Sequence, residues 1–375
     1  MEDSLNYHKK YKGKIQTALK APLSRKTLPL AYTPGVAKVA LKISKDKKLV
    51  NNYTNRGNTI AIVTDGSAVL GLQNIGPEAA LPVMEGKAVL FKKFAGIDAV
   101  SVVLETQDKE EIIKTVKNIA PGFAGINLED ISAPRCFEIE ERLDKELQIP
   151  VFHDDQHGAA VVVLAALINA LKVVFKDKKV KIAIAGGGAA GTAVTKMLSL
   201  YGFKNIITCD SKGIIESSRH DLTKSKRELA RLTSPKIKGA CSQAYVGADV
   251  FIGLSRKGVL TQEMVKTMAS GPIIFALANP DPEIEPTLAK KAGAKIVATG
   301  RSDYPNQINN ILAFPGIFRG ALDSKAKSIT YKMKLAAALA LAEYIKKLTS
   351  NRIIPNIFDR DLTKKVARAV ALATK

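Results

Sequence analysis

The sequence is poor in the residues that build disulfide frameworks and histidine-rich metal sites. It has no tryptophan, three cysteines and four histidines in 375 residues. The cysteines, Cys136, Cys209 and Cys241, are odd in number and far apart, which excludes a disulfide framework and a cysteine-ligated zinc site and predicts core thiols. Four histidines make a multi-histidine zinc site improbable. Any metal bound by this chain must therefore be held mostly by oxygen.

Long hydrophobic runs are missing as well. The longest uncharged apolar stretch, residues 158–171, is shorter than the ~20 residues that a helix needs to span a bilayer. The first residues, Met1-Glu2-Asp3-Ser4, are polar and acidic and do not have the pattern of a secretory signal or a transit peptide. We therefore expect no membrane helix and a cytoplasmic protein.

Acidic residues are scarce relative to basic ones. Against 57 Lys and Arg stand 35 Asp and Glu, which gives a formal net charge of +22. Such an excess can indicate nucleic-acid binding, because basic proteins gain affinity by displacing counterions from phosphates. The densest lysine clusters, at 45–48 and 176–179, are short and interrupted by aspartate, and aromatic residues that could stack on bases are only 6%. We interpret the charge as solvated surface that can steer acidic substrates, and expect no nucleic-acid partner.

What remains is the composition of a folded protein, with 46% apolar and 25% charged residues. The length favours two domains. Apolar strand-like runs alternate with helical segments, which is typical of parallel sheets covered by helices. The expected strands are 59–63, 99–104, 125–128, 150–152, 180–185, 205–209, 250–252, 272–277 and 295–298, and the expected helices between them are 109–118, 135–146, 159–175, 191–201 and 262–268.

These elements predict an α/β chain of two domains. Residues 1–157 would form an N-terminal α/β domain, to which the acidic residues and the resemblance described below assign metal and substrate binding. Residues 158–375 would form a C-terminal Rossmann-type domain, a doubly wound parallel sheet with terminal helices at 329–348 and 362–373 that have alanine-rich faces.

The second domain opens with a nucleotide-binding signature. The run 186–191 fits G-x-G-x-x-G between an expected strand and helix, with Gly186, Gly188, Ala189, Ala190 and Gly191 as candidate contacts. Glycines let the backbone approach a pyrophosphate, and the helix N-terminus favours its negative charge. Asp210 follows Gly191 by 19 residues, at the end of the next strand, where a carboxylate accepts hydrogen bonds from ribose hydroxyls. This acid favours NAD over NADP, although Lys212, Arg219 and Lys224 nearby weaken that preference.

Two expected strands of the first domain end in acidic residues. Glu129-Asp130 follow the strand at 125–128, and His153-Asp154-Asp155 follow the strand at 150–152. Open α/β sheets bind ligands at these strand tips, and three converging carboxylates suit Mg²⁺ or Mn²⁺. A single acid at such a position could instead cap the next helix. Metal binding is favoured because two acidic groups end equivalent strands.

Two further residues give weaker signals. Tyr32 lies in the segment Ala31-Tyr32-Thr33-Pro34-Gly35, where proline and glycine constrain a loop. Lys87 lies inside an apolar run, where burial disfavours its charge and lowers its pKa toward that of a general base. Taken individually, both patterns are more typical of packing residues than of catalytic ones.

Together these segments resemble the malic enzymes, in particular their short prokaryotic branch. The resemblance covers essentially the whole chain in order. It rests on residues 31–37, 64–71, 85–87, 127–130, 152–155, 278–280 and 307–310. It implies oxidative decarboxylation of (S)-malate to pyruvate and CO₂, with NAD or NADP and a divalent metal ion.

The resemblance also implies roles for individual residues. Lys87 would be the general base and bind substrate, and Tyr32 would be the general acid. The metal ligands would be Glu129, Asp130 and Asp155, and Asn279 and Asn310 would contact substrate and nicotinamide. With the alanine-rich terminal helices, the resemblance points to a homodimer. The large animal-type members have an arginine in the loop occupied here by Ser67-Ala68, so the group that binds the malate carboxylate differs.

Two alternatives remain at this point. An amino-acid dehydrogenase also pairs a lysine-bearing first domain with a nucleotide domain, but it needs no metal and would leave the acidic groups without a role. A basic nucleic-acid-binding protein would leave the nucleotide motif without a role. Sensitivity to chelation tests the first alternative, and titration with duplex DNA tests the second.

Overall fold

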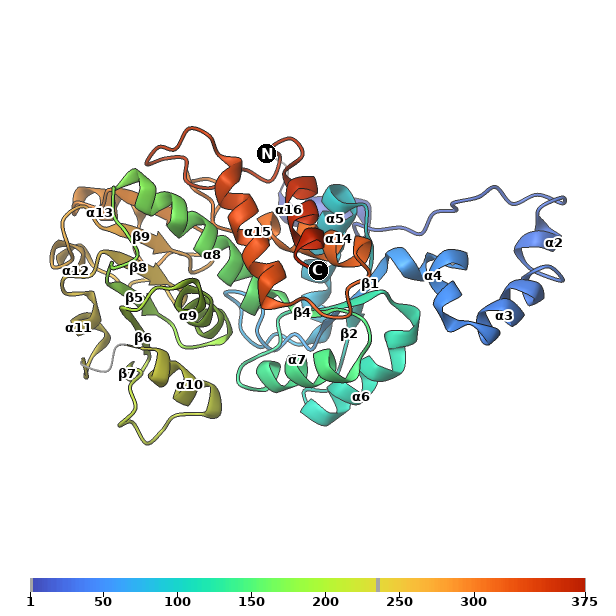
Figure 1. The fold of residues 1–375 in the computed structure, drawn as a ribbon, viewed down its shortest axis with the longest axis horizontal. Helices are drawn as coiled ribbons and strands as arrows, with labels where there is room; N and C mark the ends of the chain where they lie inside the picture. The colour runs from blue at the N-terminus through green and yellow to red at the C-terminus, as the bar shows by residue number, and fades with distance from the viewer. Residues whose placement is uncertain (1–2, 234–236, 375) are drawn as a thin grey trace.

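Two sheets organise the chain in the computed structural model, which describes residues 3–233 and 237–374 (Figure 1). The first sheet is parallel, in the order β2-β1-β3-β4. Its strands are β1 (Thr59–Thr64), β2 (Asp98–Val103), β3 (Gly125–Leu128) and β4 (Val151–His153). The strand order reverses between β1 and β3, so the carboxyl ends of these two strands flank the crevice where such sheets bind ligands.

The β1 strand shows why this sheet forms. Its six residues are all buried and mostly β-branched, as expected of a parallel strand covered on both faces. Ile60 and Ile62 face Met84 and Phe91 of α5 (Pro77–Ala95). The alternate residues pack with helices α6 (Lys109–Ile119) and α7 (Arg135–Glu146) on the opposite face.

The second sheet has the order β10-β9-β8-β5-β6-β7. Its strands are β5 (Ile182–Ala185), β6 (Ile206–Asp210), β7 (Gly213–Ile214), β8 (Val250–Gly253), β9 (Ile273–Ala276) and β10 (Ile296–Thr299). This is the Rossmann order, with the third strand reduced to two residues. The predicted parallel sheet is confirmed except for β7, which pairs antiparallel with β6 after a tight turn with Gly213 at φ 116°.

Helices cover both faces of the second sheet. One face packs against α8 (Asp154–Val173) and α9 (Ala189–Tyr201). The other face packs against α11 (Cys241–Tyr245), α12 (Gln262–Lys266) and α13 (Pro286–Lys291). The predicted doubly wound arrangement is therefore present.

Helix α8 is the central element of the fold. It starts five residues earlier than expected, directly after β4, and runs for 20 residues. By length and composition it could cross a membrane, but 72% of its most apolar window is buried inside the protein. We therefore describe α8 as a core helix. The predicted boundary between residues 157 and 158 falls inside it and stays a prediction.

The C-terminal helices return to the first sheet. They are α14 (Phe314–Asp323), α15 (Tyr331–Tyr344) and α16 (Leu362–Leu372). The rings of Phe314 and Phe318 lie with their centroids 4.7 and 5.3 Å from that of Phe91 on α5. This aromatic cluster fixes the end of the chain to the first sheet.

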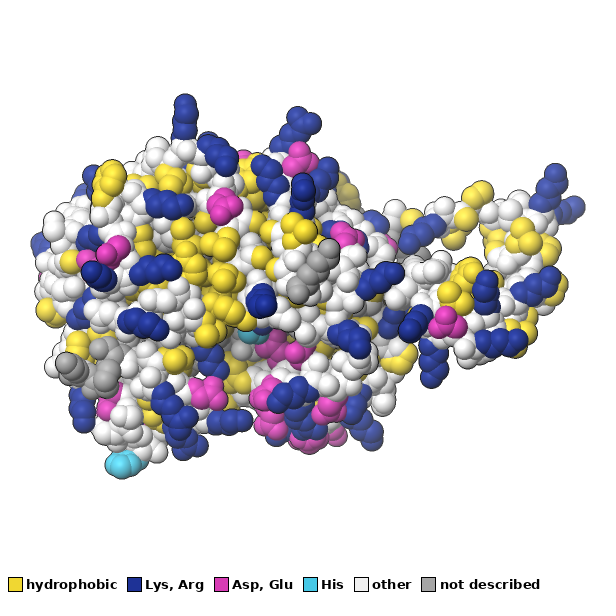
Figure 2. All heavy atoms as spheres, viewed as in Figure 1, with side chains coloured by type: hydrophobic (Ala, Val, Ile, Leu, Met, Phe, Trp, Pro, Cys, Tyr) yellow, Lys and Arg dark blue, Asp and Glu magenta, His cyan; other side chains and the backbone are white. Residues whose placement is uncertain are grey.

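An arm extends from the first sheet. It comprises residues 21–53 with α2 (Leu28–Ala31), α3 (Val36–Lys45) and α4 (Val50–Tyr53), and it projects sideways from the body, with α2 at its far end (Figure 1). No residue between 3 and 58 is buried. Figure 2 shows apolar side chains on the surface of the arm. The exposed apolar residues of the arm include Leu30, Tyr32 and Leu41, which are 74%, 68% and 63% exposed.

Basic side chains are scattered over the face of the molecule drawn in Figure 2. Many are paired with acids, as in the links from Lys109 to Glu138 and from Lys117 to Glu146 between α6 and α7. The arrangement agrees with the interpretation of the positive charge as solvated surface.

Candidate active site

Three carboxylates converge at the carboxyl edge of the first sheet. Glu129 and Asp130 follow β3 directly, and Asp155 lies in the first turn of α8, after β4. One oxygen from each of the three lies within 4.8 Å of the others. The structure thus brings together the three acids that the sequence singled out as metal ligands.

The contacts of Asp155 argue against a role as a helix cap. The residue before α8, His153, makes no side-chain cap bond, and Asp155 Oδ2 instead accepts a hydrogen bond of 2.8 Å from the backbone N–H of Asp130. This bond ties the start of α8 to the end of β3. It leaves the carboxylate directed at the other two acids rather than at its own helix.

The chemistry of this donor set fits a divalent cation. Glu129 and Asp130 are 5% and 3% exposed, and Asp130 Oδ2 is buried without a hydrogen-bond partner. Burial, together with the charges of Asp155 and Glu129, raises the pKa of Asp130 to about 9, and burial also raises the pKa of Glu129. Carboxylates that repel one another, one of them with a buried oxygen that lacks a donor, are stabilised by a hard cation with oxygen preference.

Lys87 contacts this cluster from α5. Its ammonium donates to Glu129 Oε1 at 2.5 Å and to Asp154, and it lies 4.5 Å from the ring centroid of Phe314. The expectation of a lowered pKa is wrong for this arrangement. Burial does lower the pKa of Lys87, but the negative charges of Asp154 and Glu129 outweigh it and the pKa is raised. Any positive charge that engages Glu129 would reduce this effect and bring Lys87 closer to a neutral amine.

Asp154 is a site residue that the sequence reasoning did not select. It is fully buried, and burial raises its pKa to about 6. Besides Lys87 it accepts a hydrogen bond from Asn310 Nδ2 at 2.5 Å, so Asn310 does reach the site. The sequence did contain a signal for Asp154, because it is an acid directly before Asp155 in the run His153-Asp154-Asp155.

The glycine-rich run forms the loop between β5 and α9. A Cβ on Gly191 would lie 1.8 Å from the carbonyl oxygen of Gly186, so only glycine allows the helix to start this close to the strand. At Gly188 nothing lies within 4 Å of the corresponding position, which leaves room for a pyrophosphate against the backbone. Ala189 and Ala190 are the first residues of α9, at the positive end of its dipole.

Asp210 ends β6, as expected. Its carboxylate already accepts hydrogen bonds from Arg219, from Lys226 and from the backbone of Lys212. Although burial would raise it, hydrogen bonds from Arg219 and Lys226 hold the pKa of Asp210 below its ordinary value. The acid is therefore ionised and enclosed by cations.

Asn279 lies in the loop after β9, next to a loop of the first domain. A Cβ on Gly71 would come within 2.6 Å of the backbone oxygen of Asn279, so the two loops are in close contact. The Asn279 side chain makes one long bond, 3.4 Å, to Leu277 O. Its position between the two domains suits a contact to a ligand held between them.

Tyr32 is not brought to this cluster. It follows α2 at the far end of the arm and is 68% exposed. The first sheet, whose strand β3 is followed by Glu129 and Asp130, lies at the other end of the arm (Figure 1). Within one chain, the site is thus assembled without this tyrosine.

The loop after β1 has no arginine, but a guanidinium reaches it from α7. Arg135 Nη2 donates to Asp65 Oδ2 at 2.8 Å, and Asp65 Oδ1 accepts from Ser67 Oγ at 2.5 Å. Ser67 Oγ in turn accepts the backbone N–H of Ser132, and Ala68 N–H donates to Asp130 O. This network holds the Ser67-Ala68 loop against the loop that carries Glu129 and Asp130.

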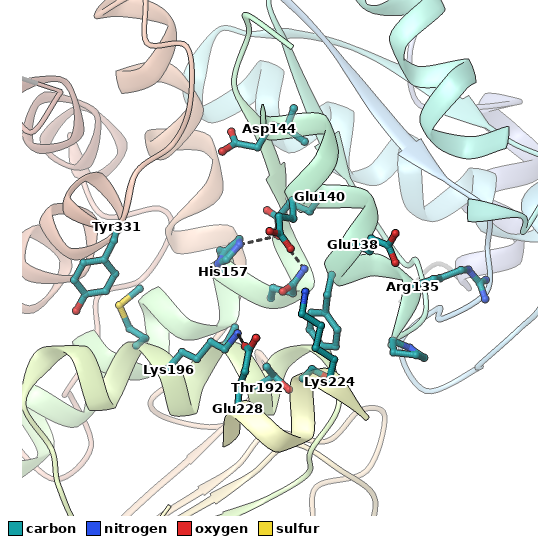
Figure 3. Close-up of a pocket in the computed structure, with 18 of the residues that line it drawn as sticks. Arg135, Glu138, Glu140, Asp144, His157, Thr192, Lys196, Lys224, Glu228 and Tyr331 are labelled. Atoms are coloured by element: carbon teal, nitrogen blue, oxygen red, sulfur yellow. Dashed lines mark hydrogen bonds and ion pairs between the residues drawn. The ribbon is translucent and has the colours of Figure 1, made fainter. Parts of the chain in front are cut away.

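A cavity of about 760 Å³ lies between α7, the start of α8, α9, α10 (Lys224–Leu232) and α15. Figure 3 shows Glu140 of α7 and His157 of α8 pointing toward each other across its wall, with Glu140 Oε2 and His157 Nε2 2.9 Å apart. Glu140 also accepts from Gln156 Nε2 and from the backbone N–H of His153. These bonds position the 153–157 segment, which carries Asp155.

Comparison with known proteins gives matches along nearly the whole chain. Residues 12–144 match the family model described as malic enzyme, N-terminal domain, and residues 156–374 match malic enzyme, NAD binding domain. The chain is 53% identical to the bifunctional malic/malolactic enzyme of Bacillus subtilis, over 99% of this chain and 92% of that protein. It is 55% identical to the NAD-dependent malic enzyme of Geobacillus stearothermophilus, over 96% of this chain and 76% of that protein.

Solved structures agree with these matches. The crystal structure of the NAD-dependent malic enzyme from Thermotoga maritima superposes with a TM-score of 0.96 at 51% identity and covers 99% of each chain. NADP-dependent malic enzymes also match, at lower identity.

Proposed function

Since this chain belongs to the malic enzyme family, we propose that its reaction takes place where Lys87 meets Glu129 and Asp154, beside Asp155. The chain oxidatively decarboxylates malate to pyruvate and CO₂, reduces NAD or NADP, and depends on a divalent metal ion, as its family does. One observation carries the residue assignment. The Lys87 ammonium is bonded to Glu129 and to Asp154 beside three convergent carboxylates, at the switch point of the first sheet.

Lys87 is the general base of this proposal. Its amine lies where it can take the proton from the C2 hydroxyl of malate, and Glu129 and Asp154 hold it in place. Glu129, Asp130 and Asp155 would hold the metal ion, and Asn310 would orient substrate through its bond to Asp154. A divalent cation held by these residues would supply Lewis-acid polarisation of substrate oxygens, and a bound nicotinamide would supply the hydride acceptor.

The cofactor would lie across the loop of Gly186, Gly188 and Gly191. Ala189 and Ala190 present backbone N–H groups of α9 to the pyrophosphate. Asn279, between the two domains, would contact substrate and nicotinamide. Asp210, at the end of β6, would lie beside the ribose of the cofactor. We keep 1–157 and 158–375 as the substrate and nucleotide domains.

Tyr32 is the general acid of the proposal, and it would act from the arm of a second copy of the chain. Helix α3 carries Val36, Val39, Ala40 and Ile43 at spacings of three and four residues, which places an apolar stripe on one face. None of these residues is buried in the single chain. An amphipathic helix on a projecting arm gains stability when another surface covers its apolar stripe.

A symmetric dimer would both cover the apolar stripe of α3 and bring Tyr32 to a site. The arm of each chain would pack its apolar stripe against the other chain and place its Tyr32 beside the other chain's Lys87. We therefore propose a homodimer, and light scattering at micromolar concentration should give about twice the 40.3 kDa of one chain. A particle of 40.3 kDa that is fully active would contradict the dimer.

We also propose a cytoplasmic location and a small-molecule substrate, with no nucleic-acid partner. The basic side chains are scattered and many are paired with acids, which supports the last of these three assignments. Titration with duplex DNA at physiological salt should show no saturable binding.

The reaction and its metal dependence are tested by absorbance of the reduced nicotinamide. We expect malate to reduce NAD or NADP when Mn²⁺ is present, and excess chelator to stop the reaction reversibly. Activity that survives complete removal of the metal would refute the role of the three carboxylates. Lys87→Ala should abolish malate oxidation in a folded protein, because the C2 hydroxyl then has no base.

A further inference from the structure

Glu283 is a buried acid that the proposed reaction does not use. It lies between β9 and α13, and its side chain is 0% exposed. Within the described residues its carboxylate accepts backbone N–H groups and pairs with no cation. Burial raises the pKa of Glu283, although hydrogen bonds from the backbone oppose this rise. A carboxylate in such surroundings needs good hydrogen bonds to be stable, so its donors show what it holds together.

The two oxygens of this carboxylate bind two different loops. Oε1 accepts the backbone N–H of Ser255 at 2.9 Å, in the loop after β8. Oε2 accepts the backbone N–H of Ala278 at 3.0 Å, in the loop after β9. Both loops leave the carboxyl edge of the second sheet, where sheets of this type bind their ligands. One buried side chain therefore joins two loops of the nucleotide site.

The end of β8 makes room for this carboxylate. A Cβ on Gly253, the last residue of β8, would lie 2.3 Å from Cδ of Glu283, so only glycine allows this approach. The backbone oxygen of Glu283 also accepts the N–H of Gly258 at 3.0 Å. Glu283 is thus bonded to the loop after β8 through both its side chain and its backbone, which fixes its position.

These bonds bear on Asn279, which directly follows Ala278. Among the described residues the Asn279 side chain makes a single hydrogen bond, and that bond is 3.4 Å long. The neighbouring bond from Ala278 to Glu283 is shorter and fixes the backbone at this point. On the other side, a Cβ on Gly186 would lie 2.4 Å from the carbonyl oxygen of Leu254, so the loop after β8 touches the glycine-rich loop. Glu283 therefore connects the loop of Asn279 to a loop that packs on the glycine-rich loop.

We propose that Glu283 is a positioning residue for the reaction, which fixes Asn279 relative to the glycine-rich loop. It acts through the backbone N–H groups of Ser255 and Ala278 and does not itself touch substrate or cofactor. The proposal rests on the role of Asn279 in the proposed function. Hydride transfer requires its reactants to be closely aligned, and a misplacement of about 1 Å can cost about 10²-fold in rate.

Amide hydrogen exchange of the ligand-free protein tests this link between the loops. Glu283→Met keeps about the size of the side chain and removes both acceptors. The N–H groups of Ser255 and Ala278 should then exchange at least about tenfold faster, because hydrogen bonds to a carboxylate are among the stronger ones. Unchanged exchange of both groups in a folded variant would overturn the proposal. If Glu283→Met does not fold, Glu283→Gln keeps one acceptor oxygen, and one of the two groups should exchange faster.

The matched control is Asp249→Leu. Asp249 directly precedes β8, at the opposite edge of the sheet, and its carboxylate also accepts a backbone N–H, that of Lys181 at 2.8 Å. This variant should speed exchange at Lys181, leave exchange at the two loops unchanged and keep kcat within about twofold. If it lowers kcat as much as Glu283→Met does, lost stability accounts for both effects and the proposal is wrong.

A double-mutant cycle tests whether Glu283 acts through Asn279. Glu283→Met and Asn279→Ala are measured singly and together, with malate and the cofactor that the wild type uses. Glu283→Met alone should lower kcat at least about tenfold and leave the Kd of the cofactor, measured by fluorescence, within about threefold. In the Asn279→Ala background the same change should lower kcat less than about twofold, because the side chain that Glu283 positions is already absent.

The cycle also separates the two proposals. If Asn279→Ala lowers kcat but Glu283→Met gives the same fold loss in both backgrounds, the role of Asn279 stands and the inference about Glu283 is wrong. If Asn279→Ala keeps the wild-type kcat, the role of Asn279 in the proposed function is refuted, and the positioning role of Glu283 is refuted with it.

Discussion

Mixed dimers of two inactive variants decide whether Tyr32 acts across the dimer. One chain carries Lys87→Ala and the other carries Tyr32→Phe, and two different affinity tags isolate the dimers that contain one of each. Lys87 is buried at the acidic cluster while Tyr32 lies on the projecting arm. If each arm reaches the acidic cluster of the other chain, the two substitutions fall in the same site. If each arm reaches the cluster of its own chain, they fall in different sites.

The expected activity follows from counting intact sites. If each site takes Lys87 from one chain and Tyr32 from the other, one site of the mixed dimer carries both defects and the other carries none. The mixed dimer should then have about half the wild-type activity. Each parent dimer has a defect in every site and should lose at least about 10²-fold, the usual contribution of a positioned proton-transfer group.

The controls make the outcome unambiguous. Dimers of Lys87→Ala with wild type should also have half the activity, and thermal melting should show that each variant is folded. Mixed dimers no more active than their parents would refute the reasoning, because every site would then keep one defect and Tyr32 would belong to its own chain's site.

Four further predictions follow from the geometry. Tyr32→Phe should slow exchange of the C3 protons of pyruvate in deuterated water at least about 10²-fold, as seen by NMR, while metal and cofactor still bind. Asp155→Ala removes one of three anionic ligands and should sharply weaken Mn²⁺ binding in calorimetry. Gly191→Ala places a Cβ 1.8 Å from Gly186 O, so the loop must shift, and NAD binding measured by fluorescence should fall at least tenfold, or about 1.4 kcal/mol. Although burial would raise it, the interaction with His157 holds the pKa of Glu140 at about 2, below its ordinary 4.5. The ionised carboxylate therefore stabilises the folded state above pH 4.5, and this stabilisation is lost as pH falls toward 2, so the stability difference between wild type and Glu140→Gln in urea should shrink as pH falls.

Each of these has a contrary outcome. Wild-type exchange by Tyr32→Phe would make the tyrosine a packing residue, and unchanged Mn²⁺ affinity in Asp155→Ala would remove that ligand from the site. Normal NAD affinity in Gly191→Ala would mean that the loop tolerates the side chain. A pH-independent stability difference for Glu140→Gln would contradict the charged state of that buried carboxylate.

The sheets were predictable because their strands are short, apolar and bounded by turn residues. All nine expected strands are present within two residues of their predicted ends, and the helix at 135–146 is found as predicted. Helix α5, which carries Lys87, was less clear, because Pro82 lies inside it and proline usually ends helices. The arm and α14 were not predicted as elements. The apolar residues of α14 find their partners far away in the sequence, and those of the arm are not buried within the chain, so local pattern gives little signal.

The site could be predicted only as far as strand ends define it. Glu129, Asp130 and Asp155 follow strands that the sequence identifies, so their convergence was foreseeable. The pKa of Lys87 is raised because the tertiary fold brings several carboxylates near it. The spacing of residues along the sequence does not predict how many carboxylates will lie there. The cations around Asp210 come from a loop and a helix 9 and 16 residues further on, and their bonds to that acid required coordinates.

Helix α8 sets the distance between the acidic cluster and the glycine-rich loop. Its first turn carries Asp154 and Asp155, and further along it packs against α9, which begins at the glycine-rich loop. Gly158 leaves room for Asn310 beside the same turn, where a Cβ would lie 2.8 Å from Asn310. The separation between the proposed metal ligands and the glycine-rich loop is therefore set by one helix-to-helix packing distance. A substitution that widens this packing should shift the hydride donor and acceptor apart without touching either ligand.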